Sequence, residues 1–380
     1  MSEIARFRFP TDIRFGAGAR LVLPEFAGRY RVTRPLLVTD SGLLPTQAFH
    51  LVVAEMDKVW PETYVQFTDV HPNPTDQDVE NAWTAYSQGD CDGIVGLGGG
   101  SALDAAKALR LKVAFPDLAL AEMPFNELPP LVPMCAIPTT AGTGSEVGRS
   151  SVITVEQMGR KAVFGAPPLM AEMAVLDPEL TVGLPSGLTA FTGMDAMTHA
   201  VEAFVCPVFH PMCDGIALEA IRLVRLYLPA AYSDGTNLEA RGFMQMAAAM
   251  GAVAFQKDLG AAHSLAHPLS SEFGVQHGLA NAIVLPHVIR FNGQEDSHLY
   301  NRVAVALGGA EPTGDSTSWV ADFLSEFNRS IGITQRLRDL DVPRERLPDL
   351  AAKAMQDGCH LSNPRRCTEA DMLRLYEETW

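Results

Sequence analysis

The stretch that decides the fold of the first half of the chain is Gly93 to Leu109, GIVGLGGGSALDAAKAL. A short apolar run, typical of a buried strand, is followed by three glycines, a serine and a run of good helix formers. Glycines at such a turn let backbone N–H groups approach a pyrophosphate, and the N-terminus of the next helix offers further donors. A tight strand-to-helix turn without a ligand fits equally well, because the GxGxxG pattern lacks its last glycine.

The rest of the first half alternates strand-like and helical segments in the same way. Strands are predicted at residues 35–39, 65–70, 93–97 and 131–137, and helices at 43–59, 77–88 and 101–111. A hairpin is predicted from Val152–Val155 and Ala162–Phe164. This alternation predicts an α/β domain, residues 1–186, with a parallel sheet, flanking helices and a dinucleotide-binding function.

The second half of the chain differs from the first in composition and in predicted secondary structure. It consists of long helical segments rich in alanine and methionine, such as Glu239–Gln256, EARGFMQMAAAMGAVAFQ. The change falls near Asp177–Leu188, where two prolines and two glycines interrupt the chain. We therefore expect an all-helical domain over residues 187–380 that holds a metal and the substrate.

Charge and hydropathy exclude several classes of partner. The 380 residues carry 29 Lys and Arg against 45 Asp and Glu, a formal net charge of −16. This charge repels phosphate backbones and anionic lipids, so we expect neither nucleic acid nor membrane as a partner. The sequence holds no apolar run of the roughly 20 residues that span a bilayer, and we expect a cytoplasmic protein.

A second loop of small residues follows the fourth predicted strand. It reads PTTAGTGSE from Pro138 to Glu146 and offers hydroxyl groups around an open backbone, suited to phosphates and a nicotinamide. Asp40 closes the first predicted strand, where a carboxylate can accept hydrogen bonds from a ribose and repel a 2′-phosphate. This favours NAD over NADP. A plain turn residue ahead of Ser41 and Gly42 is the alternative for Asp40.

Acidic and histidine side chains at helical spacing indicate a metal site in the second half. Asp195 and His199, and again His263 and His267, are separated by four residues and so share a helix face. His277 follows in Gln-His-Gly. One carboxylate and three neutral imidazoles suit Fe(II) or Zn(II). With a divalent ion this set carries a net charge of about +1, which lowers the pKa of a bound alcohol and polarises a carbonyl.

With these motifs in view, the chain resembles the iron-containing (group III) alcohol dehydrogenases. The likeness rests on GLGGGSALDAAK, PTTAGTGSE, LDPELT, GMDAMTHAVEAF, AAHSLAHPLS and HGLANAIVLPHVIRFN, in this order. The family implies an NAD(H)-linked, metal-dependent enzyme that moves a hydride between a small primary alcohol and its aldehyde, and it implies a homodimer or higher homo-oligomer.

Residue by residue, the resemblance implies these roles. The metal ligands fall on Asp195, His199, His263 and His277. The cofactor contacts fall on Asp40, Asn73, Gly98, Gly99, Gly100, Ser101, Thr139, Thr140, Ser145, Val152, Lys161 and Leu180. His267 matches a proton relay, with a spectator packed against Pro268 as the alternative. Glu202 either orients a ligand imidazole or is a surface glutamate.

The substrate is less sharply defined. By position we expect Arg149, Ser150, Phe255 and Cys359 to approach it. The local sequences around them are similar to the 4-hydroxybutyrate dehydrogenase branch, in which Arg149 would grip a remote carboxylate. An ion pair with Glu146, or exposure on a loop, is the alternative for Arg149.

Three rival functions remain at this point. A glycerol-like polyol dehydrogenase and a dehydroquinate synthase-like lyase share the glycine-rich cofactor loop. A non-catalytic dinucleotide- or metal-binding module is the third. The complete metal-ligand set and His267 argue against the last.

Overall fold

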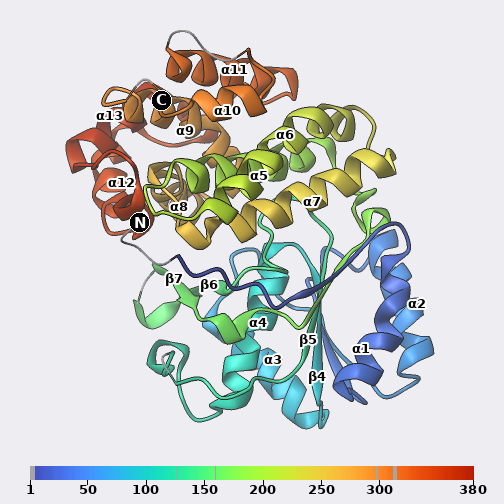
Figure 1. Cartoon of the computed structure of the whole chain (residues 1–380). Coiled ribbons are helices and arrows are strands. Elements are labelled where there is room, and N and C mark those ends of the chain that lie inside the picture. Colours follow the sequence, from blue (N-terminus) through green and yellow to red (C-terminus); the bar gives the residue numbers. More distant parts are fainter. Residues whose placement is uncertain (1–4, 126, 159, 297, 311–314) are drawn as a thin grey trace. The chain divides into compact units, whose positions relative to one another are not determined.

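The computed structural model describes residues 5–125, 127–158, 160–296, 298–310 and 315–380. The chain forms two compact units. One consists of Arg8–Leu184 with Thr236–Gln245, and the other of residues 5–7 with Pro185–Gly235 and Met246–Trp380. The predicted fold class is confirmed, because a parallel α/β unit is followed by a helical one (Figure 1).

A six-stranded parallel sheet forms the centre of the α/β unit, with strand order β1-β8-β5-β4-β2-β3. Its strands are β1 (Asp12–Phe15), β2 (Pro35–Val38), β3 (Val65–Phe67), β4 (Gly93–Gly98), β5 (Met134–Pro138) and β8 (Met173–Leu176). The main helices are α1 (Leu23–Tyr30), α2 (Gln47–Val59), α3 (Asp76–Gln88) and α4 (Gly100–Ala114). The antiparallel hairpin β6 (Ser150–Val155) and β7 (Arg160–Gly165) is separate from the sheet.

Helices cover both faces of this sheet (Figure 1). Successive side chains of a strand point to opposite faces, and along β5 Cys135 and Ile137 join one buried cluster while Met134 and Ala136 join another. Helices α1 and α2 complete the first cluster, and α3 and α4 the second. Strands buried on both faces read as continuous apolar runs, which is why the sequence predicted β2, β4 and β5.

Two strands of the sheet, β1 and β8, were not predicted from the sequence. Strand β1 is an edge strand that pairs with β8, and its charged Asp12 and Arg14 obscure an apolar pattern. Strand β8 has four residues, MAVL, and follows a proline-containing 3-10 turn. An edge strand has one neighbour and tolerates charge, so composition gave no signal for β1.

The helical unit contains α5 (Ser186–Val205), α6 (Pro211–Ser233), the end of α7 (Leu238–Ala254), α8 (Ala261–Phe273), α9 (His277–Asn292), α10 (Asn301–Ala306), α11 (Ser316–Ser330), α12 (Leu347–Ala354) and α13 (Glu369–Thr379). None of the helices that the structure describes is long and apolar enough to cross a membrane.

Two short segments do not follow a single boundary at residue 186. Each packs in the unit to which that boundary would not assign it. The start of α7 joins the α/β unit, where Arg241 donates to the Leu184 carbonyl at 3.1 Å and Gln245 to the Pro138 carbonyl at 3.4 Å. Residues 5–7 join the helical unit, where the ring of Phe7 meets that of His210 edge-on. The division into residues 1–186 and 187–380 stays a prediction.

A buried carboxyl group in the loop after β5 makes the α/β unit sensitive to pH. Glu146 is buried, and this burial raises its pKa to about 7, partly opposed by the charge of Lys107. Between its ordinary pKa and pH 7, the folded protein keeps a proton that the unfolded chain has lost. Stability therefore falls as pH rises through this window.

We expect Glu146→Gln to remove this dependence. From pH 5 to pH 8 the wild type should lose about 2 kcal/mol more stability than the variant. Calorimetric unfolding at both pH values measures this difference. Glu127→Gln, at an exposed loop position of the same unit, is the control, and parallel pH profiles for Glu146→Gln and wild type would refute the assignment.

Candidate functional site

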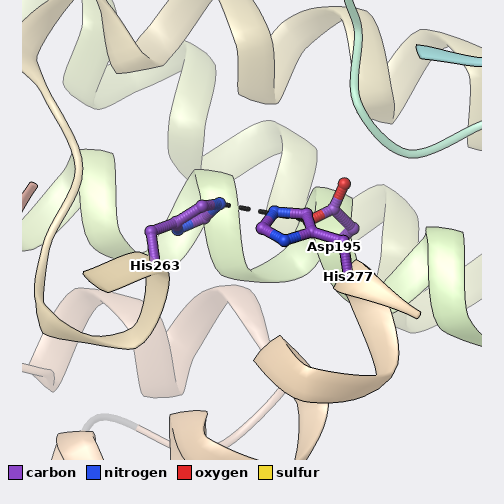
Figure 2. A group of neighbouring side chains, drawn as sticks. All are labelled: Asp195, His263 and His277. Carbon is purple, nitrogen blue, oxygen red and sulfur yellow. Dashed lines mark ion pairs between the residues drawn. The ribbon is translucent and has the colours of Figure 1, made fainter. Parts of the chain in front are cut away.

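Three helices of the helical unit bring the predicted metal ligands together. Asp195 and His199 lie one turn apart on α5, His263 lies in the first turn of α8, and His277 is the first residue of α9. Ligand atoms of Asp195, His263 and His277 all lie within 4.8 Å of one another (Figure 2). His199 joins them, since its ring stacks on that of His263 with centroids 4.7 Å apart.

The nitrogen atoms converge on one carboxylate oxygen. Asp195 Oδ1 lies 3.5 Å from Nε2 of His277 and 4.0 Å from Nε2 of both His263 and His199. Two ligands bonded to one ion at about 2.1 Å and a tetrahedral angle lie about 3.4 Å apart. The distance to His277 matches this spacing, and the two distances of 4.0 Å exceed it by only about 0.6 Å, so the four side chains lie close enough to share one divalent ion.

Charge also fits a cation at this point. Burial alone would raise the pKa of Asp195, but the neighbouring imidazoles, that of His199 foremost, hold the pKa below its ordinary range. The group is thus an ionised carboxylate inside the protein. A metal cation can replace the ring protons as the positive charge beside this carboxylate, because unprotonated Nε2 atoms and a carboxylate oxygen are all acceptors.

A glycine permits the close approach of α9 to α5. A Cβ atom on Gly278 would lie 2.0 Å from the Phe191 backbone oxygen and 3.2 Å from Cβ of Asp195. No side chain fits in this space. The Gln-His-Gly sequence therefore places His277 beside Asp195 because the next residue has no side chain.

Glu202 orients the ring of His263 through Nδ1, the nitrogen that faces away from Asp195. It lies on the face of α5 that carries Asp195 and His199, is buried, and contacts Nδ1 of His263 through Oε2 at 2.5 Å. Its Oε1 accepts the Ala262 backbone N–H at 2.7 Å. Burial would lower the pKa of His263, but the Glu202 carboxylate raises it. With the proton held on Nδ1, Nε2 keeps the lone pair that a metal needs.

Asn281 is a site residue that the sequence analysis missed. It lies one turn after His277 on α9 and is fully buried. Its Nδ2 donates to Asp195 Oδ1 at 2.9 Å and lies 3.3 and 3.2 Å from Nε2 of His263 and His277. The partly positive amide hydrogens meet the same three atoms that would bind a cation. The i, i+4 spacing from His277 was the available signal.

Three further predicted residues surround this cluster. His267, one turn after His263 on α8, stacks on His277 with ring centroids 5.2 Å apart. The ring of Phe255 lies 5.1 Å from that of His199. Cys359 groups with His267 and Asp357, their ligand atoms lying within 4.8 Å of one another. The helical unit thus places the predicted relay and two predicted substrate residues around the ligands.

In the α/β unit, Gly99 and Gly100, directly after β4, lie close to the side chains of Thr140 and Thr143. Gly98 ends β4 with φ +144°, a conformation that favours glycine. A Cβ atom on Gly100 would lie 2.7 Å from the Thr143 hydroxyl, and one on Gly99 3.4 Å from the Thr140 methyl. Asp40 Oδ1 accepts the Leu43 N–H at 3.1 Å, so Asp40 also fulfils its alternative role in the turn.

The remaining predicted cofactor residues fall into separate groups. Lys161 donates to Asn73 Oδ1 at 2.7 Å, and burial lowers the pKa of Lys161. Asp104 accepts the Ser145 hydroxyl at 2.5 Å and the Val152 N–H at 2.9 Å. The others occupy the start of α4 (Ser101), the loop after β5 (Thr139) and the buried turn after β8 (Leu180).

Arg149 and Ser150 lie at the start of the hairpin in the α/β unit. Arg149 is exposed, and within the described chain its guanidinium has neither Glu146 nor another group as a hydrogen-bond or ion-pair partner. The Ser150 carbonyl accepts from the buried Lys107 ammonium. Arg149 is thus free for a ligand, whereas the backbone of Ser150 has a structural role.

Comparison with known proteins decides the family. The model of iron-containing alcohol dehydrogenases matches residues 10–178, and that of the C-terminal part of the Fe-containing alcohol dehydrogenase family matches residues 189–380. The chain belongs to the iron-containing alcohol dehydrogenase family. It is an NAD-dependent alcohol dehydrogenase of this type.

Relatives within the family cover nearly the whole chain. The 4-hydroxybutyrate dehydrogenase of Cupriavidus necator is 36% identical over 97% of this chain and 98% of its own length. The NAD-dependent methanol dehydrogenase of Bacillus methanolicus is 35% identical over 98% and 99%. A solved 1,3-propanediol oxidoreductase is 34% identical with a TM-score of 0.94, covering both chains completely. An alcohol dehydrogenase from Oenococcus oeni is 31% identical, with a TM-score of 0.94, over 99% of this chain and 100% of its own.

We expect Glu202→Gln to weaken metal binding by about 10- to 100-fold. The Ala262 N–H needs an acceptor and so retains the amide oxygen, which leaves the amide nitrogen facing Nδ1 of His263. The imidazole proton then moves to Nε2 and blocks it. Competitive Zn(II) titration of the metal-free protein measures the loss. Glu219→Gln, which removes an exposed ion pair with Arg222 on α6, should bind as wild type. Wild-type affinity in Glu202→Gln would rule out the orienting role.

Proposed function

We propose that this enzyme transfers a hydride between NAD(H) and a small primary alcohol or aldehyde at a divalent metal held by Asp195, His199, His263 and His277. The observation that carries the proposal is the convergence of three imidazole Nε2 atoms on one buried carboxylate oxygen. Fe(II) is the favoured ion because the matching family models are those of iron-containing enzymes. Zn(II) is the alternative, because it accepts the same nitrogen and carboxylate ligands.

Each part of the chain has a role in this proposal. When bound, the metal polarises the substrate oxygen and NAD accepts the hydride. Glu202 fixes the ring of His263 through Nδ1, and Asn281 donates to the Asp195 carboxylate. His267, beside His277, accepts the hydroxyl proton during oxidation and returns it during reduction. Its side chain keeps 21% of its surface exposed, so the proton can leave to solvent.

The cofactor role falls to the loops at the carboxyl ends of β2, β4 and β5. Gly98 to Ser101 offer backbone N–H groups at the start of α4, with Thr139 and Thr140 beside them. The carboxylate of Asp40, at the end of β2, disfavours the 2′-phosphate of NADP. These positions support NAD as the dinucleotide.

An anaerobic activity screen tests this function. The metal-free protein is loaded with Fe(II) or Zn(II) and assayed at 340 nm with NAD(H) or NADP(H) against primary alcohols and aldehydes, glycerol and a dehydroquinate synthase assay. We expect metal-dependent activity on primary alcohols, with NAD preferred by at least about tenfold in kcat/KM. Activity restricted to glycerol, dehydroquinate formation, or no turnover with either metal would refute the proposal.

Within this class we propose an ω-hydroxy acid such as 4-hydroxybutyrate as substrate, with succinic semialdehyde as product. A relative with this activity in its name aligns along almost the whole chain. Arg149 supplies a cation without a partner in the described chain, suited to a carboxylate. Phe255 and Cys359 lie near the metal ligands, where they can contact the carbon chain.

Arg149→Ala separates this substrate from a plain alcohol. We expect kcat/KM for 4-hydroxybutyrate to fall about 10- to 100-fold, the loss of one charge-assisted contact, while kcat/KM for 1-butanol stays within about twofold. Steady-state kinetics on both substrates gives the ratio. Arg34→Ala, an exposed arginine of the same unit, serves as control. An unchanged ratio would eliminate the carboxylate contact.

A further inference from the structure

A second carboxylate–imidazole pair lies beside the metal site. Asp357, in the turn between α12 and η9 (Cys359–Ser362), contacts Nδ1 of His267 through Oδ2 at 2.7 Å. Within the described chain, Nε2 of His267 has no hydrogen-bond partner. Burial would raise the pKa of Asp357, but the hydrogen bond and charge of His267 hold it well below the ordinary range. Asp357 is therefore an ionised acceptor.

The other oxygen of Asp357 is fixed by two donors. Oδ1 accepts the Ser264 hydroxyl at 2.8 Å and the Cys359 backbone N–H at 2.9 Å. Ser264 is completely buried on α8, between His263 and His267, and its hydroxyl also accepts the His360 N–H at 2.9 Å. Asp357 is thus held in one orientation by both backbone and side chain.

A cation site formed by His267, Asp357 and Cys359 is disfavoured by the contacts that these residues already make. Both carboxylate oxygens of Asp357 already accept protein hydrogen bonds. Burial, followed by the charge of Asp357, raises the pKa of the Cys359 thiol well above its ordinary value. A protonated thiol is a poor ligand and a poor nucleophile.

We propose that Asp357 is a positioning residue that keeps the proton of His267 on Nδ1, so that Nε2 is the atom that accepts the alcohol proton. This inference rests on the proposed alcohol oxidation. In that reaction the hydroxyl proton passes to Nε2, and the electron pair of the broken C–H bond leaves with the hydride to NAD. A carboxylate that fixes the tautomer also stabilises the imidazolium that forms.

Because two donors hold Oδ1 of Asp357, the substitution Asp357→Asn should reverse the tautomer of His267. The Cys359 N–H can only donate, so the amide oxygen must stay on that side. The amide nitrogen then faces Nδ1 of His267 and forces it to accept a hydrogen bond. The ring proton moves to Nε2, and the side chain loses the atom that accepts from the alcohol, although its shape is nearly unchanged.

We expect kcat for alcohol oxidation to fall about 100-fold or more in Asp357→Asn, with KM changed by less than about threefold. Asp357→Ala should lose less, because it leaves the tautomer of His267 unconstrained rather than reversed. If Asp357 had only a structural role, Asp357→Ala would lower kcat more than Asp357→Asn, because alanine removes more contacts. In a His267→Gln background, Asp357→Asn should cause no further loss of kcat. Asp349→Asn, which alters exposed pairs of α12 with Arg346 and Lys353, should behave as wild type.

A spectroscopic measurement reads the tautomer without turnover. In Zn(II)-loaded protein labelled with ¹⁵N-histidine, the His267 signals, assigned by their absence in His267→Gln, should show a protonated Nδ1 in wild type and a protonated Nε2 in Asp357→Asn. An unchanged tautomer, or unchanged kcat in an active enzyme, would overturn the proposal. If the wild type oxidises no alcohol, the proposed function fails, while the spectrum still decides whether Asp357 sets the tautomer.

Discussion

The helical unit depends on one electrostatic constraint, the burial of the Asp195 carboxylate. Removing an ionised carboxylate from water costs several kcal/mol unless nearby groups compensate. Here the compensation comes from Asn281 and from the imidazoles of α5, α8 and α9. These helices must therefore pack closely at the site. Gly278 lacks the side chain that would block α9, and a Cβ atom on Gly251 would lie 3.3 Å from Cβ of His199.

The same arrangement of carboxylate and imidazole occurs twice along α8, with different consequences. Glu202 holds the Nδ1 side of His263, and Asp357 holds the Nδ1 side of His267, one turn later. His263 is 2% exposed and its Nε2 faces Asp195, whereas His267 is 21% exposed. The same orientation thus suits the proposed metal ligand, whose ring is enclosed, and the proposed proton acceptor, whose ring water can reach.

Much of this arrangement could be predicted from the sequence, and the limits have physical causes. Residues one helical turn apart share a face, so Asp195 with His199 and His263 with His267 were identifiable from spacing alone. Buried parallel strands appeared as apolar runs. Contacts between segments distant in the sequence were not visible. Asp357 lies 90 residues after His267, in a turn without a motif, and only tertiary packing brings them together.

Specificity within the family requires a contact away from the metal. Dehydrogenases named for 4-hydroxybutyrate, 1,3-propanediol and methanol are 36%, 36% and 35% identical to this chain, so identity alone does not select a substrate. In the proposed reaction a metal at this site would contact only the hydroxyl end, which these alcohols share. A chain with a net charge of −16 also repels an anionic substrate at long range. Binding a carboxylate therefore needs a local cation without an internal partner, and Arg149 meets this requirement in the described chain.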